Sequence, residues 1–460
     1  MSRVRGGAAA GAAPGRSARI TQGVTMTGRP MNRIFEEITE QRGKQGKLGR
    51  KLRMNRERNW LLALTLNSYA KADAGLPLND LDSIITTAFD TSGLGDTLRE
   101  HGRFYASMST GTRKELFPGT FATMDPSADY TLEDLRRDLP GLDDAVRAMP
   151  NAVDIDVAGV HAGLIHRGDV VRPSREVRRQ YAGELVRAVE PDHPGMVALA
   201  ETDRYSIKAV KFHCTDETGA DWLGSDEPYW IFGSLGGGVA VTTRSHVFED
   251  IDSGDDATFG ATEGWIWGQG ARPQLLPEGE IGTLIQLWEH DAGDTDDVKK
   301  AVEAAFATAA GVLTATGAAA WIAGVTAAVG AVVSWIIGVL DDDHIGDQTF
   351  VFSRQTILSQ AGKVGQSFDV SFQLTDGDGD YTLTLTVTNE GPAPTTSTVP
   401  DVLEARVGAA VSAVIGAGLT PHVTGATGVS AWVFSQSPQG GAVVDRGSTV
   451  NLVGKAGPMP

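Results

Sequence analysis

The sequence predicts a multidomain α+β protein: a helical N-terminal domain, an antiparallel β-sandwich with an inserted apolar helical hairpin, and a small C-terminal βαββ module. Three observations support this class. Amphipathic helical patterns dominate up to about residue 200, strand-like runs rich in Val, Ile, Thr and aromatic residues follow, and residues 304–340 are Ala- and Gly-rich without a charge or a proline. The expected boundaries are a disordered basic arm at 1–30, the helical domain at 31–200, the sandwich at 201–390 with its insertion at 298–343, a linker at 391–398 and the module at 399–455.

The N-terminal arm differs in charge from the rest of the chain. The protein has 460 residues and a net charge of −18, but the stretch up to Arg58 is strongly basic. A basic arm attracts nucleic acid or anionic lipid. Residues 43–58, GKQGKLGRKLRMNRER, form a basic connector between two expected helices. No zinc-ligand spacing or aromatic platform accompanies it, so we expect a solvated linker and no nucleic-acid partner. The first 30 residues lack the apolar core of a cleavable signal peptide, and the single cysteine, Cys214, rules out an intramolecular disulfide.

Short amphipathic patterns predict the helices of the N-terminal domain. Asn79 and Thr131 precede two of these patterns, and both have side chains that are preferred at helix N-caps. The expected helices are Met31–Gly43, Arg56–Ala72, Asn79–Phe89, Leu98–Met108, Thr131–Met149 and Arg175–Val189.

Strand-like segments begin at Arg204 and are separated by acidic loops. Short strands with turns at such intervals are typical of an antiparallel β-sandwich. The expected strand segments are 204–214, 227–235, 237–248, 282–291, 348–358, 367–376 and 380–389.

The apolar segment 304–340 interrupts this strand series. It exceeds the roughly 20 apolar residues that a membrane-spanning helix needs, although only its second half, from Trp321, is strongly hydrophobic. We expect two antiparallel helices that are broken near Gly317. Such a hairpin could be buried inside a soluble domain, could enter a membrane, or could contribute one transmembrane helix. Membrane lipid is therefore an expected partner through 304–340.

The C-terminal stretch contains the most specific motif of the chain. A short entry segment, an amphipathic helix that ends near Gly418, and two strands with a Pro-Gly turn between them follow in order. The stretch resembles a PASTA domain, the βαββ module of penicillin-binding proteins and bacterial Ser/Thr kinases. Matching residues are Val399, Pro400, Asp401, Val402, Ala410, Gly418, Leu419, Val433, Gln436, Ser437, Pro438, Gly440, Gly447, Ser448, Thr449 and Val450.

Two positions depart from the pattern of that family: Glu404 replaces a usual glycine, and Ala431-Trp432 replaces a small turn. The resemblance implies binding of peptidoglycan or muropeptides. The chain contains no kinase HRD or DFG motif and no SxxK, SDN or KTG set, so the catalytic functions of those families do not transfer.

The acidic loops of the β region suggest a cation site. The segments DWLGSDEPYWIF, WEHDAGDTDD and DDDHIGDQTFVF loosely resemble calcium-dependent, lipid-docking β-sandwich domains. Calcium takes six to eight hard oxygen ligands, which acidic loops that meet at one end of a sandwich would supply. Solvated acidic turns are the alternative interpretation. The candidate calcium ligands are Asp221, Asp226, Glu227, Asp291, Asp294, Asp341, Asp342 and Asp347.

These observations favour a non-enzymatic bacterial protein of the cell envelope or membrane, in which the module binds peptidoglycan and the hairpin contacts membrane, with a pore-forming or toxin-like action as one use of the hairpin. An alternative is a single-pass membrane protein whose cytoplasmic helical domain acts as an envelope sensor or scaffold; lysines before the segment and aspartates after it agree with that orientation. An enzyme is disfavoured because no nucleophile–base pair, phosphate loop or metal frame stands out in the sequence.

Overall fold

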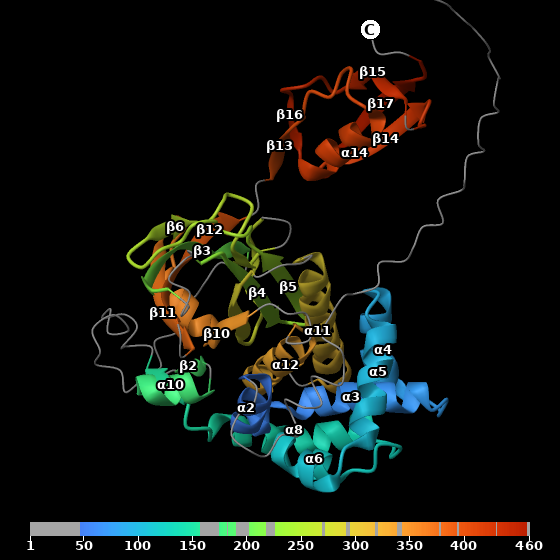
Figure 1. Cartoon of the computed structure of the whole chain (residues 1–460). Coiled ribbons are helices and arrows are strands. Elements are labelled where there is room, and N and C mark those ends of the chain that lie inside the picture. The colour runs from blue at the N-terminus through green and yellow to red at the C-terminus, as the bar shows by residue number, and fades with distance from the viewer. Residues whose placement is uncertain are drawn as a thin grey trace, which may run out of the picture.

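The computed structural model describes residues 47–156, 174–181, 183–189, 202–217, 226–268, 272–290, 295–317, 321–337, 343–376, 379–392, 395–428 and 430–457. The basic arm 1–30 and the helix expected at Met31–Gly43 lie outside these residues. Within them the chain is a mixed α+β protein, as the sequence predicts. Figure 1 shows the first helices on one side of two sheets, and the C-terminal module as a separate unit.

The helical part begins with α2, which is followed by the 3-10 helix η1 and by helices that pack around α3. Helix α3 is buried along almost its whole length, because apolar or uncharged side chains cover nearly all of its surface. The bounds are α2 Lys47–Met54, η1 Arg56–Arg58, α3 Trp60–Asp73, α4 Asp80–Thr91, α5 Gly95–Ser107, α6 Thr110–Leu116, α7 Gly119–Thr123 and α8 Leu132–Arg147.

The two predicted N-caps are confirmed. The side chain of Asn79 accepts a hydrogen bond from the backbone N–H of Asp82, and Asp82 accepts one from the backbone N–H of Asn79, at 3.0 Å each. Thr131 and Asp134 make the same reciprocal pair at the start of α8. Such capping boxes satisfy two backbone donors that the first turn of a helix leaves free.

The first sheet is mixed, and this differs from the wholly antiparallel sandwich that the sequence predicts. Its strand order is β1-β2-β10-β9-β4-β5. Strand β2 pairs in parallel with both β1 and β10, and the remaining pairs are antiparallel. The bounds are β1 Ala152–Asp156, β2 Gly183–Val189, β4 Pro228–Gly236, β5 Val239–Arg244, β9 Ile281–Glu289 and β10 Asp343–Phe352.

Strand β2 also corrects the helix expected at Arg175–Val189. Only Arg175–Tyr181 is helical, as α10, and Gly183–Val189 is extended. The alternation in ELVRAV suits a strand, with Leu185 buried on one face and Val186 on the other. The helical expectation failed because the partner strand β10 lies more than 150 residues away, beyond any local pattern.

The second sheet has the strand order β11-β12-β3-β6, and β7 and β8 also pair with β3. A core of apolar side chains from both sheets lies between them. In this core the ring of Phe212 lies 5.4 Å from that of Trp230, and the ring of Phe350 lies 4.9 Å from that of Phe372. The bounds are β3 Asp203–Asp216, β6 Asp256–Thr258, β7 Trp265–Trp267, β8 Gln274–Leu275, β11 Ser367–Asp376 and β12 Gly379–Pro392, with the short helix α13 Arg354–Gln360 before β11.

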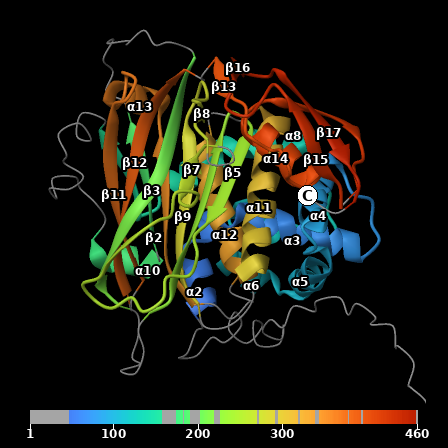
Figure 2. The ribbon, with the colours of Figure 1, turned by 90° about the horizontal axis from the view of Figure 1, so that it is seen from above.

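The apolar segment forms two helices, α11 Thr295–Thr316 and α12 Ile322–Ile337. Gly317 follows α11 with a φ of +68°, a conformation that glycine adopts without steric cost. Every residue of α12 is buried. Figure 2 shows α11 and α12 between the sheets and the N-terminal helices.

The burial of α12 corrects the expectation of a transmembrane helix. Among the described residues, no helix combines the length and the apolar character that a bilayer crossing requires. The apolar side chains instead join one large core with the N-terminal helices and one face of the first sheet. Trp335 donates its indole N–H to Nδ1 of His101 at 3.2 Å, and Asp143 of α8 accepts from the backbone N–H of Gly324 at 3.0 Å.

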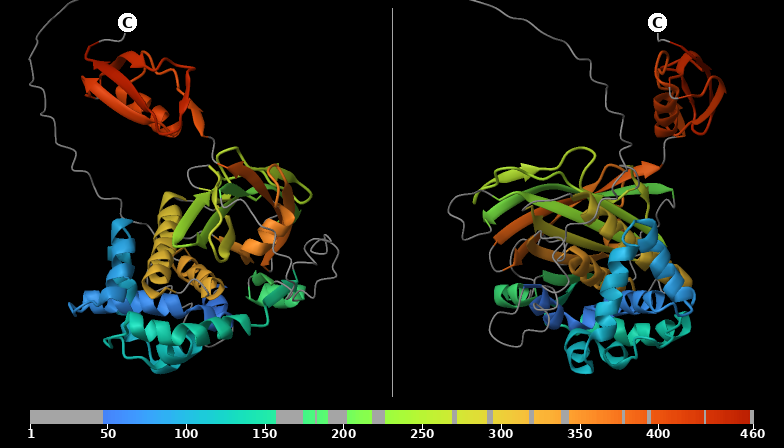
Figure 3. Two further views of the ribbon diagram at one scale, coloured as in Figure 1. Left: turned by 180° about the vertical axis from the view of Figure 1, so that it is seen from behind. Right: turned by 45° about the vertical axis from the view of Figure 1, so that its right-hand side comes forward.

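The same core includes residues from both sides of the expected boundary at residue 200. Helices α2 to α8, the hairpin helices and the first sheet share one apolar cluster, so the helical and β regions form one packed unit. Strands β1 and β2, which lie within the expected helical range 31–200, belong to the first sheet. Figure 3 shows this arrangement from two further directions.

The C-terminal module has its own core, whose side chains all come from residues 399–452. Helix α14 packs its buried residues on a three-stranded sheet of order β14-β17-β15, and β13 pairs with β16. The bounds are β13 Thr396–Thr398, α14 Val407–Gly416, β14 Thr420–Gly425, β15 Trp432–Ser437, β16 Val443–Asp445 and β17 Thr449–Lys455.

Candidate functional site

The candidate ligand-binding surface is the face of the module's sheet that points away from α14. Along β17, Val450 and Leu452 are buried toward the helix, so Asn451, Val453 and Lys455 point to the opposite face. Phe434 on the neighbouring strand β15 is 58% exposed. We call Phe434, Asn451, Val453 and Lys455 the open face of the module.

An aromatic ring and a cation lie side by side on the open face. The ammonium of Lys455 is 5.1 Å from the ring centre of Phe434 and 5.9 Å from that of Trp432. The two rings meet edge to face at 6.0 Å, and a cation within about 6 Å of a ring face is held by it. On the central strand, Asn451 is hydrogen-bonded to His422 of β14 at 3.1 Å.

This arrangement suits a ligand with both apolar and polar groups. An exposed ring offers a flat surface for the C–H face of a sugar, amide and imidazole groups offer hydrogen bonds to hydroxyls, and an ammonium offers an ion pair to a carboxylate. All of these groups are present on or beside the open face.

The motif residues of the module hold its fold and contribute little to the open face. The side chain of Gln436 accepts from the backbone N–H of Val402 at 2.9 Å and donates to the carbonyl of Pro400 at 2.6 Å, which fixes the entry segment. Gly440 lies against Asp401, where a Cβ atom would come within 2.5 Å of the Asp401 side chain. Glu404 has a φ of +62°, so the departure from the usual glycine falls on a left-handed residue.

The predicted calcium ligands are only partly described by the structure. Asp226 is buried between the two sheets, where it accepts a hydrogen bond from the hydroxyl of Tyr381, and the neighbouring Glu227 is exposed. Asp347 lies on the other face of the first sheet, toward α2 and α12, so Asp226 and Asp347 do not share a site. Five candidates lie outside the described residues: Asp221, Asp291, Asp294, Asp341 and Asp342.

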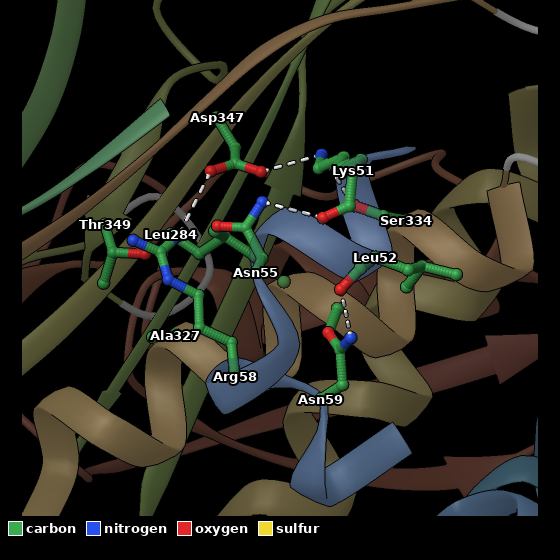
Figure 4. Close-up of a pocket in the computed structure, with 12 residues that line it drawn as sticks. Lys51, Leu52, Asn55, Arg58, Asn59, Leu284, Ala327, Ser334, Asp347 and Thr349 are labelled. Atoms are coloured by element: carbon green, nitrogen blue, oxygen red, sulfur yellow. Dashed lines mark hydrogen bonds and ion pairs between the residues drawn. The ribbon is translucent and has the colours of Figure 1, made fainter. Parts of the chain in front are cut away.

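Asp347 is the centre of a buried polar cluster (Figure 4). Its carboxylate is 2.8 Å from the ammonium of Lys51 and 3.7 Å from Nη1 of Arg58. Lys51 also donates to the hydroxyl of Ser334 at 3.0 Å and lies 3.0 Å from Nε2 of His344. The cluster joins α2, η1, α12 and β10, and it surrounds a cavity of about 20 Å³. This volume is enough for a water molecule.

Two buried groups with reactive side chains are held in unreactive states. Burial raises the pKa of the Cys214 thiol to about 11, which disfavours the nucleophilic thiolate. Burial lowers the pKa of His101 to about 4, and its Nδ1 accepts the indole N–H of Trp335. Among the described residues, no group of three or more His, Cys, Asp or Glu side chains is arranged to hold a metal ion.

The sequence did not point to the main residues of the Asp347 cluster or of the open face. Lys51 and Arg58 lie in a stretch that reads as a solvated basic linker, yet both are largely buried. Phe434 and Lys455 lie outside the motif positions of the module. The alternation of β17, with Val450 and Leu452 on one face, was the available signal for the open face.

Comparison with known proteins supports the C-terminal resemblance. The PASTA domain family model matches residues 397–454. The C-terminal module is therefore a PASTA domain. The match covers the module alone, and no functionally curated protein matches the chain.

The similar solved structures are distant. Human GIVD cytosolic phospholipase A2, in complex with a fluorophosphonate inhibitor and terbium chloride, is 8% identical over 41% of this chain and 18% of its own, with a TM-score of 0.21. A C2 domain of plant extended synaptotagmin 1 is 6% identical over 42% of this chain and 99% of its own, also with a TM-score of 0.21. The chain thus spans under a fifth of the phospholipase. These matches include a C2 domain, but such scores carry no argument about fold or activity.

Proposed function

We propose that this chain is a non-enzymatic bacterial protein of the cell envelope that holds peptidoglycan fragments on the open face of its PASTA domain. The observation that supports this most directly is the exposed ring of Phe434 next to the ammonium of Lys455 on a domain of a peptidoglycan-binding family. The ring would stack on a sugar of the glycan strand. The ammonium would pair with a carboxylate of the muropeptide.

The larger unit acts in this proposal as a folded body that the PASTA domain tethers to the wall. Its apolar hairpin is part of the core, so the proposal assigns the hairpin no membrane role. An envelope scaffold or sensor is the use that such a body supports.

The proposal is tested by sedimentation of the full-length protein with purified bacterial cell walls and by titration with soluble muropeptides. Phe434→Ser should weaken binding about tenfold, because the loss of a well-placed aromatic contact of about 1.4 kcal/mol corresponds to that factor. Lys455→Gln should weaken binding of fragments that carry free carboxylates and should leave binding of uncharged glycan largely unchanged.

The matched control is Ile415→Ser. Ile415 is 56% exposed on α14, on the opposite side of the same domain, so its replacement removes a similar exposed apolar area away from the open face. Equal loss of binding in the Phe434 and Ile415 variants would refute the open face as the site. Full-length protein that neither sediments with cell walls nor binds muropeptides would refute the function.

A further inference from the structure

The polar cavity beside Asp347 contains hydrogen-bond donors that the protein itself does not satisfy. Among the described residues, Nε and Nη2 of Arg58 have no acceptor within hydrogen-bond distance, and the hydroxyl of Thr349 has no partner. Arg58 is 4% exposed and Thr349 is fully buried, and both line the cavity with Asp347 (Figure 4). Unsatisfied buried donors of this kind each cost about 1–3 kcal/mol, and more when the group is charged.

The charges around the cavity are also unbalanced. On this face of the sheet, Lys51 and Arg58 supply two buried cations and Asp347 supplies one anion. The Lys51 ammonium is satisfied by Asp347 and Ser334, but the guanidinium of Arg58 meets Asp347 only along one edge, at 3.7 Å. The buried Glu184 pairs in register with Gln348 and so points to the opposite face of the sheet. Within the part of the chain that the structure describes, the cavity side therefore carries an excess of one positive charge.

We propose that this cavity binds a single small inorganic anion of halide size, such as chloride. The anion would accept from Nε and Nη2 of Arg58 and from the Thr349 hydroxyl, and it would neutralise the excess charge. The volume of about 20 Å³ is close to what one water-sized occupant needs, which favours a monatomic anion. The anion would join η1 to β10 and thereby strengthen the packing of the N-terminal helices on the first sheet. This proposal is independent of peptidoglycan binding.

The competing occupant is an ordered water molecule, which would also accept hydrogen bonds from Arg58. Water differs from chloride in two measurable ways: it carries no charge, and its binding does not depend on the salt that is present. Three oxygen acceptors that also line the cavity have no hydrogen-bond donor among the described residues, Oδ1 of Asn55, of Asn59 and of the Asp347 carboxylate, and these would suit a water. The test must therefore separate halide from water.

The experiment compares thermal unfolding of the full-length protein in sodium chloride, sodium bromide and sodium gluconate at equal ionic strength. Chloride and bromide should raise the Tm saturably, by about 2–4 °C, while gluconate, which is too large for the cavity, should not. Thr349→Val keeps the side-chain shape, removes one donor and should weaken the halide midpoint at least tenfold. Thr65→Val is the matched control, because Thr65 is a buried threonine of α3 that bonds only within its own helix.

Crystals grown in bromide provide the second readout, an anomalous peak between Arg58 and Thr349. Three results would overturn the proposal: gluconate as effective as chloride, a halide response that Thr349→Val leaves unchanged, or a bromide-grown crystal without a peak in the cavity. The last of these would assign an ordered water only.

Discussion

The contact between Phe306 of α11 and Gly233 of β4 decides whether the apolar hairpin is a fixed part of the core. A methyl carbon on Gly233 would lie 2.0 Å from Cε2 and 2.1 Å from Cζ of Phe306. The ring belongs to a dense apolar cluster, so it has little room to move. Gly233→Ala alone should therefore destabilise the protein by about 1–3 kcal/mol through overpacking.

Removal of the Phe306 ring opens space beside Gly233. Phe306 is fully buried, and Phe306→Ala should cost about 3–5 kcal/mol through lost burial and a new cavity. In that background the methyl group of Gly233→Ala points into the space that the ring leaves. The double variant should therefore be no less stable than Phe306→Ala alone, with a coupling energy of at least about 1 kcal/mol.

The assay is urea unfolding of the four proteins of the double-mutant cycle, followed by tryptophan fluorescence. Gly141→Ala is the control for a glycine replacement, because a methyl group there meets no atom within 4 Å and the position lies inside α8. It should be neutral or stabilising by up to about 1 kcal/mol. If Phe306→Ala does not fold, Phe306→Leu removes the same Cε2 and Cζ atoms at lower cost. Additivity within about 0.5 kcal/mol would refute the contact and reopen the membrane-entering hairpin.

Three further predictions concern other parts of the chain. Glu404→Gly should stabilise the PASTA domain by up to about 1 kcal/mol, because the φ of +62° strains any residue with a Cβ, whereas Glu404→Ala should give no gain in thermal melts. Calcium, the cation proposed for the acidic loops, should raise the Tm relative to the Tm measured with chelator. Asp226→Asn and Asp291→Asn should abolish that shift, while Asp347→Asn, on the other face of the sheet, should not. If calcium does not shift the Tm of the wild-type protein, the acidic loops are only solvated turns. The free energy of unfolding should fall by roughly 3 kcal/mol as the pH drops from 6.5 to 4, because His101 has a pKa of about 4 in the folded state and takes up its proton more readily in the unfolded state. His101→Gln should flatten this part of the curve of unfolding free energy against pH. An unchanged curve would contradict the assignment of the effect to His101.

The PASTA domain was predictable because its geometry is local. Gln436 and the residues that it bonds, Pro400 and Val402, lie within one short module, and Gly440 must stay small because the Asp401 side chain packs against it. Such constraints fix residue types at fixed spacings. The caps at Asn79 and Thr131 were predictable for the same reason, since each acts over three residues.

The position of the hairpin was not predictable from its composition. Apolar residues with interspersed glycines suit a helix in lipid and a helix against a sheet equally well. The structure makes the distinction through distant partners: Gly282 of β9 lies against Thr326, and Gly324 lies against Asp143 of α8, so small residues on both sides allow close approach. A local pattern does not contain these pairs.

The Asp347 cluster shows the same limit for a site. The acidic run DDDHIGD identified Asp347 as a charged residue of interest, but its environment depends on Lys51 and Arg58, which lie almost 300 residues earlier. Taken locally, the carboxylate suggests a cation ligand and the two basic residues suggest a solvated linker. Once η1 and α2 pack on the sheet, the carboxylate is already paired with an ammonium, and the remaining charge at the cavity is positive. The charge that a buried site can accept therefore depends on tertiary pairing, and at Asp347 this pairing is the basis of the proposed anion.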